Sequence, residues 1–430
     1  MTASSPAGVS GRRTSLWFHA DFRRLWAGDT VSQFGSSVGN TAIPLLAATV
    51  LAAGPFQMGL LTAAENAAFL FLGLPAGVWV DRMRRRPLMI RADLTRAVVL
   101  LSVPGAWWAG WLTLTQLVVV ALLVSVGTLF FDIAYQSYLP SLVGREHLVE
   151  GNAKLQTSQS VAQILGPGAA GALTQFAGAA NAVLTTGLGY LASALFLGRI
   201  KAVEPEPRRR DDAGLRAEIG EGLRFVFRNP TLRAITTCTG TANLGFSAFM
   251  AVEILFLTRD LRLSPAGAGT LLTLAGFGGV AGALGSGWWA RRVGQARAIW
   301  LVLLVTDPAL LLIPLAEPGW RVVLVPIGLV FLGYGVVVYN VSQVSYRQAV
   351  CPDHLLGRMN ASIRFVVWGI GPIGGLTGGA LGEWIGVRGT VWVTLGTQIV
   401  AVLPVLLSPL RTMRDIPVEP NESDEEDVAR

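Results

Sequence analysis

The chain has few charged residues, cysteines and histidines for its length. Of its 430 residues only 14% are Asp, Glu, Lys or Arg, whereas soluble domains carry about 25%. The two cysteines, Cys238 and Cys351, have no CxxC spacing, and we expect both to be free thiols. Because hydrophobic residues make up 52% of the chain, the composition indicates an integral membrane protein.

The chain also lacks the motifs of several functional classes. No GxxxxGK[ST] phosphate-binding loop occurs, so the energy for any transport comes from an ion gradient or from the cargo itself. Neither a metal-ligand cluster nor a nucleophile constellation is present, and we expect no cofactor, no metal and no enzyme activity. The net charge of +7 comes from basic residues in many short loops, which argues against nucleic-acid binding.

Apolar runs recur along the whole chain. A membrane span needs about 20 mostly apolar residues. By that measure we predict twelve spans, at residues 24–50, 57–80, 88–111, 114–138, 154–177, 181–200, 231–257, 266–290, 296–316, 320–346, 358–383 and 388–410.

A polar segment at 201–230 divides the spans into two groups of six. Its second part has Leu215, Ile219, Leu223 and Phe227 at helical spacing, which predicts an amphipathic helix on the membrane face. The expected domains are a short N-terminal segment (1–21), two six-helix bundles (22–200 and 231–410), this linker, and an acidic, disordered tail (411–430).

Lysine and arginine gather in the loops after every second span. The other loops hold only Arg259, Arg262, Arg321 and Arg388, so the basic loops and both termini are expected in the cytoplasm. Residues 1–20 lack an apolar core followed by a cleavage site, so we expect the first span to direct insertion into the cell membrane.

The two halves repeat each other. Residues 140–153 resemble residues 350–361, and Gly166-Pro167 in the first half corresponds to Gly371-Pro372 in the second. Each match falls between spans of equal rank, so the repeat is parallel. A duplicated six-helix unit is a transporter plan, with cargo bound between the halves near mid-membrane.

The loop after the second span resembles a known family motif. Gly77, Asp81, Arg82 and Arg86 look like the GxxxDRxxRR loop of the major facilitator superfamily. Further stretches, at 22–26, 73–77, 92–96 and 139–153, are similar to its macrolide-efflux-type branch of drug:proton antiporters. The resemblance runs from about Phe22 to Leu410 and implies an all-α membrane fold of two parallel-related six-helix bundles.

The resemblance implies a conformational latch. In such transporters the loop acid, here Asp81, meets the start of the eleventh span in the outward-open state, where a helix N-terminus stabilises a carboxylate. Arg358 at that helix start is a possible second partner, and Gly77 permits close approach of the two helices. The alternative is a loop that only fixes topology.

One position departs from the family pattern. Drug antiporters of this kind carry an arginine in the fourth span, but residues 114–138 contain no Arg or Lys. The fourth span instead contains Asp132, and the third contains Arg96. We predict that these two residues pair, with Asp93 near Arg96 at i, i+3.

Acidic residues within spans are candidates for proton coupling, because an ionisable group inside the membrane costs free energy and therefore usually has a function. Glu65 is the first choice and Asp132 the second, although a structural ion pair explains Asp132 equally well. Glu253 alternatively reaches the membrane interface, and Asp307 alternatively caps a helix break before Pro308.

Glycines and prolines mark the fifth and eleventh spans. Gly166, Pro167 and Gly171, and likewise Gly371, Pro372 and Gly375, resemble a degenerate antiporter signature GPxxGG. We interpret them as a contact where the halves rock, with plain helix packing as the alternative.

A drug-type cavity needs apolar and aromatic walls with few polar groups. The candidates for this lining are Gln33, Phe34, Asn40, Asn243, Phe246, Tyr339, Asn340 and Gln343. Helix–helix contacts are the alternative for each of them.

Taken together, these features predict a monomeric secondary transporter that exports amphiphilic small molecules, drug-like or antibiotic-like, by alternating access and proton antiport. The alternative is an exporter of one endogenous metabolite such as a siderophore. A non-transporting sensor or a membrane enzyme is less favoured.

Overall fold

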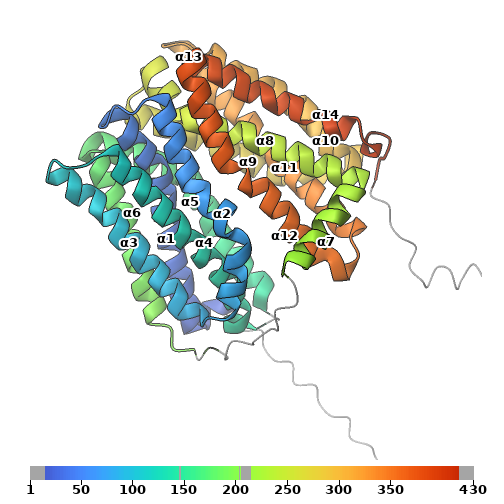
Figure 1. The fold of residues 1–430 in the computed structure, drawn as a ribbon, viewed down its shortest axis with the longest axis horizontal. Coiled ribbons are helices and arrows are strands. Elements are labelled where there is room, and N and C mark those ends of the chain that lie inside the picture. Colours follow the sequence, from blue (N-terminus) through green and yellow to red (C-terminus); the bar gives the residue numbers. More distant parts are fainter. Residues whose placement is uncertain (1–14, 145–146, 203, 205–214, 416–430) are drawn as a thin grey trace, which may run out of the picture.

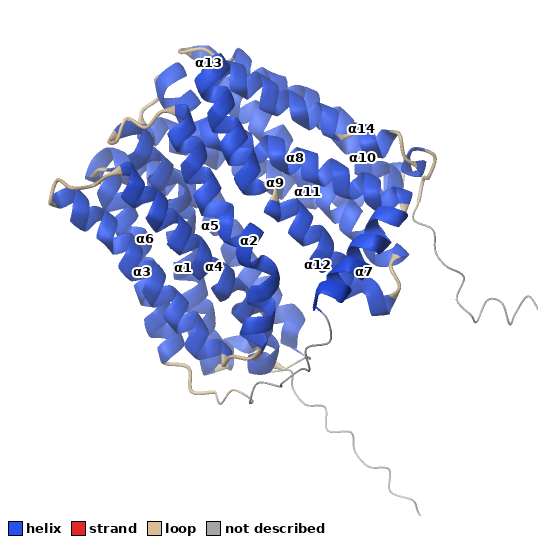
Figure 2. Ribbon diagram, in the orientation of Figure 1, coloured by secondary structure: helices blue, strands red, loops and turns tan. Residues whose placement is uncertain are grey.

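The computed structural model describes residues 15–144, 147–202, 204 and 215–415. Every regular element in these residues is a helix (Figure 2). The helices form two bundles that stand side by side (Figure 1), which confirms the predicted fold class.

The first bundle consists of six long helices. They are α1 (Ala20–Thr49), α2 (Pro55–Asp81), α3 (Arg85–Trp108), α4 (Leu114–Val143), α5 (Leu148–Ala177) and α6 (Ala179–Gly198). Helix α1 packs on α5 and α6, while α3 packs on α4 and α6 and α2 packs on α4. A short 3-10 helix, η1 (Leu16–Phe18), precedes α1.

The second bundle contains more interrupted helices. They are α8 (Pro230–Leu255) with η3 (Phe256–Asp260), α9 (Pro265–Val293), α10 (Gln295–Thr306) with η4 (Asp307–Leu315), η5 (Trp320–Val323) with α11 (Leu324–Val350), α12 (Asp353–Gly369), α13 (Gly371–Ala401), α14 (Leu403–Leu406) and η6 (Pro409–Arg411). Within α13, Gly386 has a φ of 77°, a left-handed conformation that glycine adopts without strain. The chain therefore turns at Gly386 and runs back along the bundle.

Each of the twelve predicted spans coincides with a helical segment. The span predicted at 358–383 is split between α12 and α13, because Gly371-Pro372 starts a new helix. Seven helical segments of the described chain are long and apolar enough to cross a membrane. They include α4, α6, α9 and the segment Trp320–Val350.

The predicted amphipathic helix is present as α7 (Leu215–Arg228). Its side chains at Leu215 and Ile219 lie outside the described residues. Val226 is fully buried in a cluster with Met359 and Ile363 of α12, whereas Phe227 is exposed. Helix α7 is thus docked on the second bundle through part of its apolar face.

The two ends of the molecule differ in their loops. We call the end that carries the α2–α3 loop, with Arg82 to Arg86, the arginine-rich end, and the other the opposite end. Between the bundles, α2 packs on α13 and α12, and α5 packs on α9. These contacts involve the first half of α2 and the last half of α5, so the bundles meet towards the opposite end. The described residues of α4 make no extensive contact with the second bundle.

Candidate functional site

A cluster of buried charged side chains lies inside the first bundle. Asp93 and Arg96 of α3 are fully buried and form an ion pair. Asp29 of α1 is also buried, and Asp132 of α4 is half-buried. The charges of Asp132, Asp93 and Arg96 all act on Asp29. Three carboxyl groups therefore share one guanidinium in this part of the described chain.

Arg96 is held by both polar and aromatic contacts. Its Nη1 donates to Thr128 Oγ1 at 3.2 Å. Its guanidinium carbon lies 4.1 Å from the ring centre of Tyr190 and 4.6 Å from that of Phe131, which are favourable cation–π distances. A Cβ at Gly127 would lie 2.7 Å from Arg96 Cγ, so the glycine gives the arginine stem its room.

The structure confirms the predicted contact between Arg96 and Asp93 but does not show the predicted pair with Asp132. Arg96 bonds to Thr128, one turn away from Asp132 along α4, and Asp93 on the same helix takes the ion pair. Asp132 interacts with Arg96 only electrostatically, without a hydrogen bond or ion pair in the described residues. The short i, i+3 geometry within α3 outcompetes the longer reach between helices.

Asp132 has a second cationic neighbour, on the other bundle. Arg364 of α12 acts on it electrostatically and has an exposed side chain. Both residues lie about three helical turns from the arginine-rich ends of their helices. An exposed guanidinium at that depth is costly in lipid, which places Arg364 towards the space between the bundles.

Sequence reasoning missed two members of this constellation. Asp29 lies within the predicted span 24–50, and its carboxylate accepts a 3.5 Å hydrogen bond from Gln33, one turn further along α1. Arg364 lies within the predicted span 358–383. The signal that would have found both is a charged residue well inside an apolar run.

The other acid candidates have different surroundings. Glu65 of α2 is half-buried, and its carboxyl group makes no hydrogen bond to described residues. Its neighbour Asn66 packs beside Gly371, so Glu65 lies close to where the bundles meet. Glu253 is buried near the end of α8. Asp307 begins η4 and accepts a 3.4 Å hydrogen bond from Thr306, which fits the helix-break alternative.

The predicted cavity residues of α1 do not share one face. Phe34 lines an apolar groove of about 460 Å³ with residues of α5 and α6. Gln33 is turned by about 100° from it and bonds to Asp29. Asn40 is exposed. Gln33 and Asn40 therefore remain cavity candidates, while Phe34 belongs to the groove.

In the second bundle, several candidates make helix–helix bonds. Asn243 donates to the carbonyl of Val367 at 3.0 Å, and Tyr339 shares a 2.6 Å hydrogen bond with Thr239. Gln343 is buried and instead donates within its own helix, α11, to Asn340 at 3.3 Å.

Two candidates of the second bundle have exposed side chains. These are Asn340 of α11 and Phe246 of α8.

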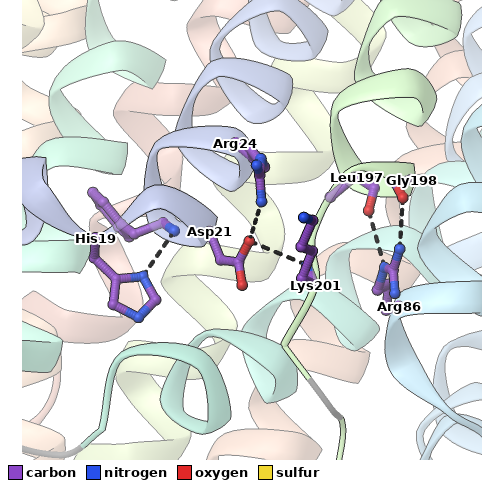
Figure 3. A network of polar contacts seen from close by, with 8 residues as sticks. His19, Asp21, Arg24, Arg86, Leu197, Gly198 and Lys201 are labelled. Atoms are coloured by element: carbon purple, nitrogen blue, oxygen red, sulfur yellow. Dashed lines mark hydrogen bonds and ion pairs between the residues drawn. The ribbon is translucent and has the colours of Figure 1, made fainter.

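The loop after α2 has a structural role at the arginine-rich end. Arg86 donates to the carbonyls of Leu197 at 3.0 Å and Gly198 at 2.7 Å (Figure 3), which caps the end of α6. The backbone N–H groups of Arg85 and Arg86 donate to Glu204 at 2.6 and 3.1 Å. The first residues of the linker are thereby fixed to the start of α3.

A neighbouring contact also involves the chain after α6. Asp21 accepts hydrogen bonds from the Lys201 backbone N–H at 3.1 Å and from Arg24 at 2.6 Å (Figure 3). Burial raises the pKa of Asp21, but these hydrogen bonds outweigh it and hold the pKa below its usual value. His19 accepts from the N–H of Phe22 at 3.1 Å and caps α1.

The predicted latch falls partly outside the described residues. The side chains of Asp81 and Arg358 lie outside the described residues. Arg82 is exposed, and a Cβ at Gly77 would meet no described atom within 4 Å. Among the described residues, α2 therefore makes no close approach at Gly77 in this conformation.

The glycine–proline segments lie at helix contacts. Gly171 packs against Gly269 of α9, and Gly375 packs against Gly59 of α2. Gly371 contacts Asn66 of α2. Gly166 instead packs against α1 within its own bundle, at Ser37, and Pro167 and Pro372 lie beside these glycines in α5 and α13.

Two named relatives match most of the chain. The multidrug efflux pump Tap of Mycolicibacterium fortuitum is 27% identical over 353 residues, covering 79% of this chain and 84% of the relative. The enterobactin exporter EntS of Escherichia coli O127:H6 is 26% identical over 424 residues, covering 94% and 96%.

Solved transporters share the fold. A bacterial homologue of the iron transporter ferroportin, in an inward-facing state, superposes with a TM-score of 0.74 at 17% identity, covering 90% of this chain and 98% of that one. The nucleoside transporter NupG gives a TM-score of 0.71 at 12% identity, covering 90% and 98%.

The family model of the Major Facilitator Superfamily matches residues 25–373 and 237–429. Because the match extends over nearly the whole chain, this protein belongs to the Major Facilitator Superfamily and is a membrane transporter rather than an enzyme.

Proposed function

We propose that the protein exports amphiphilic small molecules across the cell membrane in exchange for protons, with both termini in the cytoplasm. The observation that carries the proposal is the buried cluster of Asp29, Asp93 and Asp132 around a single guanidinium. If all three carboxyl groups were ionised, Arg96 would compensate one of them. Arg364 of the other bundle also acts on Asp132, so at least one negative charge would remain unbalanced. A bound proton relieves that repulsion.

The cargo class rests on the relatives. Tap is a multidrug efflux pump and EntS an enterobactin exporter, and both names describe export. Drug-like amphiphiles are the main candidates. An anionic metabolite such as a siderophore is the second candidate, because the exposed Arg364 is suited to an acidic group on the cargo.

The conformation supports a place in the transport cycle. The bundles pack together towards the opposite end, and the described residues of α4 make no extensive contact with the second bundle. With the arginine-rich end in the cytoplasm, as the positive-inside rule favours, this is an inward-facing arrangement. Alternating access then requires the arginine-rich end to close and the opposite end to open.

Asp132 and Arg364 suggest how the proton is linked to that motion. When the arginine-rich end closes, α4 and α12 approach, and an ionised Asp132 meets Arg364. A proton taken up from outside neutralises Asp132 and weakens the pair, so the end reopens. Loss of the proton to the cytoplasm restores the carboxylate for the next cycle. The protonated form thus returns the transporter to the inward-facing state, whereas the deprotonated form carries the cargo outward.

We expect Asp132→Asn or Glu65→Gln to abolish uptake driven by a pH gradient in everted vesicles, because an amide cannot exchange a proton. Binding of a fluorescent dye that serves as the cargo should remain detectable. Glu317→Gln, which removes an exposed acid paired with Arg321 at 2.9 Å, is the matched control and should transport normally. Gradient-driven uptake by both test variants would remove these acids from the coupling pathway.

A second measurement separates the two cargo classes. Arg364→Gln should slow transport of every dye, because Asp132 loses its partner in closure. It should slow an anionic dye more strongly, because only the anion also loses a charge-assisted hydrogen bond. The measurement is uptake of one anionic and one cationic dye into the same vesicles. Equal losses for both dyes would assign Arg364 to closure alone and count against the anionic cargo.

A further inference from the structure

The contact between the bundles at the opposite end consists of two copies of one structural unit. In the first copy, Gly59 of α2 packs on α13. A Cβ at Gly59 would lie 2.5 Å from the carbonyl oxygen of Gly375 and 2.7 Å from the Cα of Gly379. Only glycine permits backbones to approach this closely.

The second copy joins α9 to α5. A Cβ at Gly269 would lie 2.4 Å from the carbonyl oxygen of Pro167 and 3.0 Å from the Cα of Gly171. Gly269 occupies the position of Gly59 in the sequence repeat, because both follow a helix-starting proline, Pro265 or Pro55, by the same number of residues.

Each crossing also carries a side-chain cap from the other bundle. Glu383 Oε1 of α13 accepts a 3.3 Å hydrogen bond from the N–H of Phe56, the second residue of α2. Gln175 Oε1 of α5 accepts one of the same length from the N–H of Ala266, the second residue of α9. These N–H groups have no partner inside their own helices.

The two caps occupy equivalent positions in the two crossings. Gln175 follows Gly171, and Glu383 follows Gly379, by the same number of residues. The two crossings therefore share the position of the cap but differ in its chemistry. One cap is a carboxylate, which the positive pole of a helix start favours, and the other is a neutral amide.

An additional bond supports the crossing that carries the carboxylate. Arg259 of η3 donates to the carbonyl of Ala53 at 2.7 Å and to that of Ala48 at 3.4 Å. The second bundle thus bonds to the end of α1 and to the loop that leads into α2. The repeat copy at α5 and α9 shows no such arginine in the described residues.

We infer that Glu383 and Gln175 are positioning residues, which cap α2 and α9 at equivalent points of the two crossings. They set how firmly the bundles close at the opposite end, which forms the outer gate in the proposed orientation. The inference rests on the proposed orientation of the protein but not on its cargo or on protons. The caps differ in charge, and a carboxylate caps a helix start more strongly than an amide does. Glu383→Gln should therefore weaken closure, and Gln175→Glu should strengthen it.

The test uses accessibility from outside. In a background with Cys238 and Cys351 replaced by alanine, a single cysteine at Asn40 reports on the cavity through its rate of labelling by an impermeant maleimide in intact cells. Glu383→Gln should raise the labelling rate about two- to five-fold, and Gln175→Glu should lower it by a similar factor. The double exchange should return the rate close to that of the parent.

Each outcome has a definite meaning. Shifts of equal sign in the two single variants, or no shift in either, would overturn the inference. Equal amounts of monodisperse protein on size-exclusion chromatography show that the variants fold. Because labelling needs neither cargo nor a pH gradient, a failure of proton antiport leaves this result interpretable.

Discussion

Gly379→Ala is expected to abolish transport while leaving the protein folded. A Cβ at this position would lie 2.9 Å from the Cα of Gly59 and 3.0 Å from both the Cα of Phe56 and the carbonyl oxygen of Pro55. All three atoms belong to the backbone of α2 and cannot rotate away. The methyl group therefore prevents α13 from meeting α2, and the opposite end stays open.

The effect should be conformational rather than a loss of stability, because the clash exists only when the two bundles close. Labelling of a cysteine at Asn40 from outside should rise to its maximum, and vesicle uptake should fall to background. Gly396→Ala, in the part of α13 after the turn at Gly386, is the control, since a Cβ there meets no described atom within 4 Å. Near-normal transport by Gly379→Ala would show that the halves do not need this contact.

The repeat predicts the same behaviour for Gly171→Ala, whose Cβ would lie 2.4 Å from the carbonyl oxygen of Pro265. Either substitution alone should be sufficient, because both crossings must close together. The double variant should then be no worse than each single variant.

The second large effect is expected for Arg96→Leu. Removing the guanidinium leaves Asp93 buried without its ion-pair partner and removes the cation that also acts on Asp29 and Asp132. Breaking a buried ion pair from one side costs about 3–5 kcal/mol. We expect a melting temperature in detergent several degrees lower, with much less folded protein in the membrane.

A compensating variant tests the cause. Arg96→Leu combined with Asp93→Asn removes both charges, and should recover most of the stability, because neutral groups do not need the cation. Transport should not recover, since Asp29 and Asp132 still lack the guanidinium that acts on both of them. If the single Arg96→Leu variant melts with the parent protein, the cluster is not a source of stability.

Much of the fold was predictable because membrane helices are specified locally. Apolar length located the helical segments, including the break between the predicted spans 358–383 and 388–410, where the chain turns at Gly386. The repeat matched Gly166-Pro167 with Gly371-Pro372, but these residues do not make equivalent contacts, since Gly166 packs on α1 and Gly371 on α2. The split at Gly371-Pro372 follows the rule that proline favours the first turn of a helix.

The site was less predictable, because it depends on which faces of distant helices meet. The spacing of Asp93 and Arg96 fixed their contact within one helix. The absence of an Asp132–Arg96 ion pair, in contrast, depends on the register of α4 against α3. Phe34 and Gln33 are adjacent in sequence but lie on different faces of α1. Helical periodicity predicts that they point in different directions, but not which of the two faces the cavity.

The segment between the bundles is attached to the rest of the protein at two places. Glu204 is fixed to the start of α3 through two N–H groups, and α7 is fixed to α12 through Val226. Eleven residues lead from Glu204 to Leu215, and a chain of that length spans at most about 35–40 Å. This covalent length sets an upper bound on the distance between the start of α3 and the start of α7 in any state of the transport cycle.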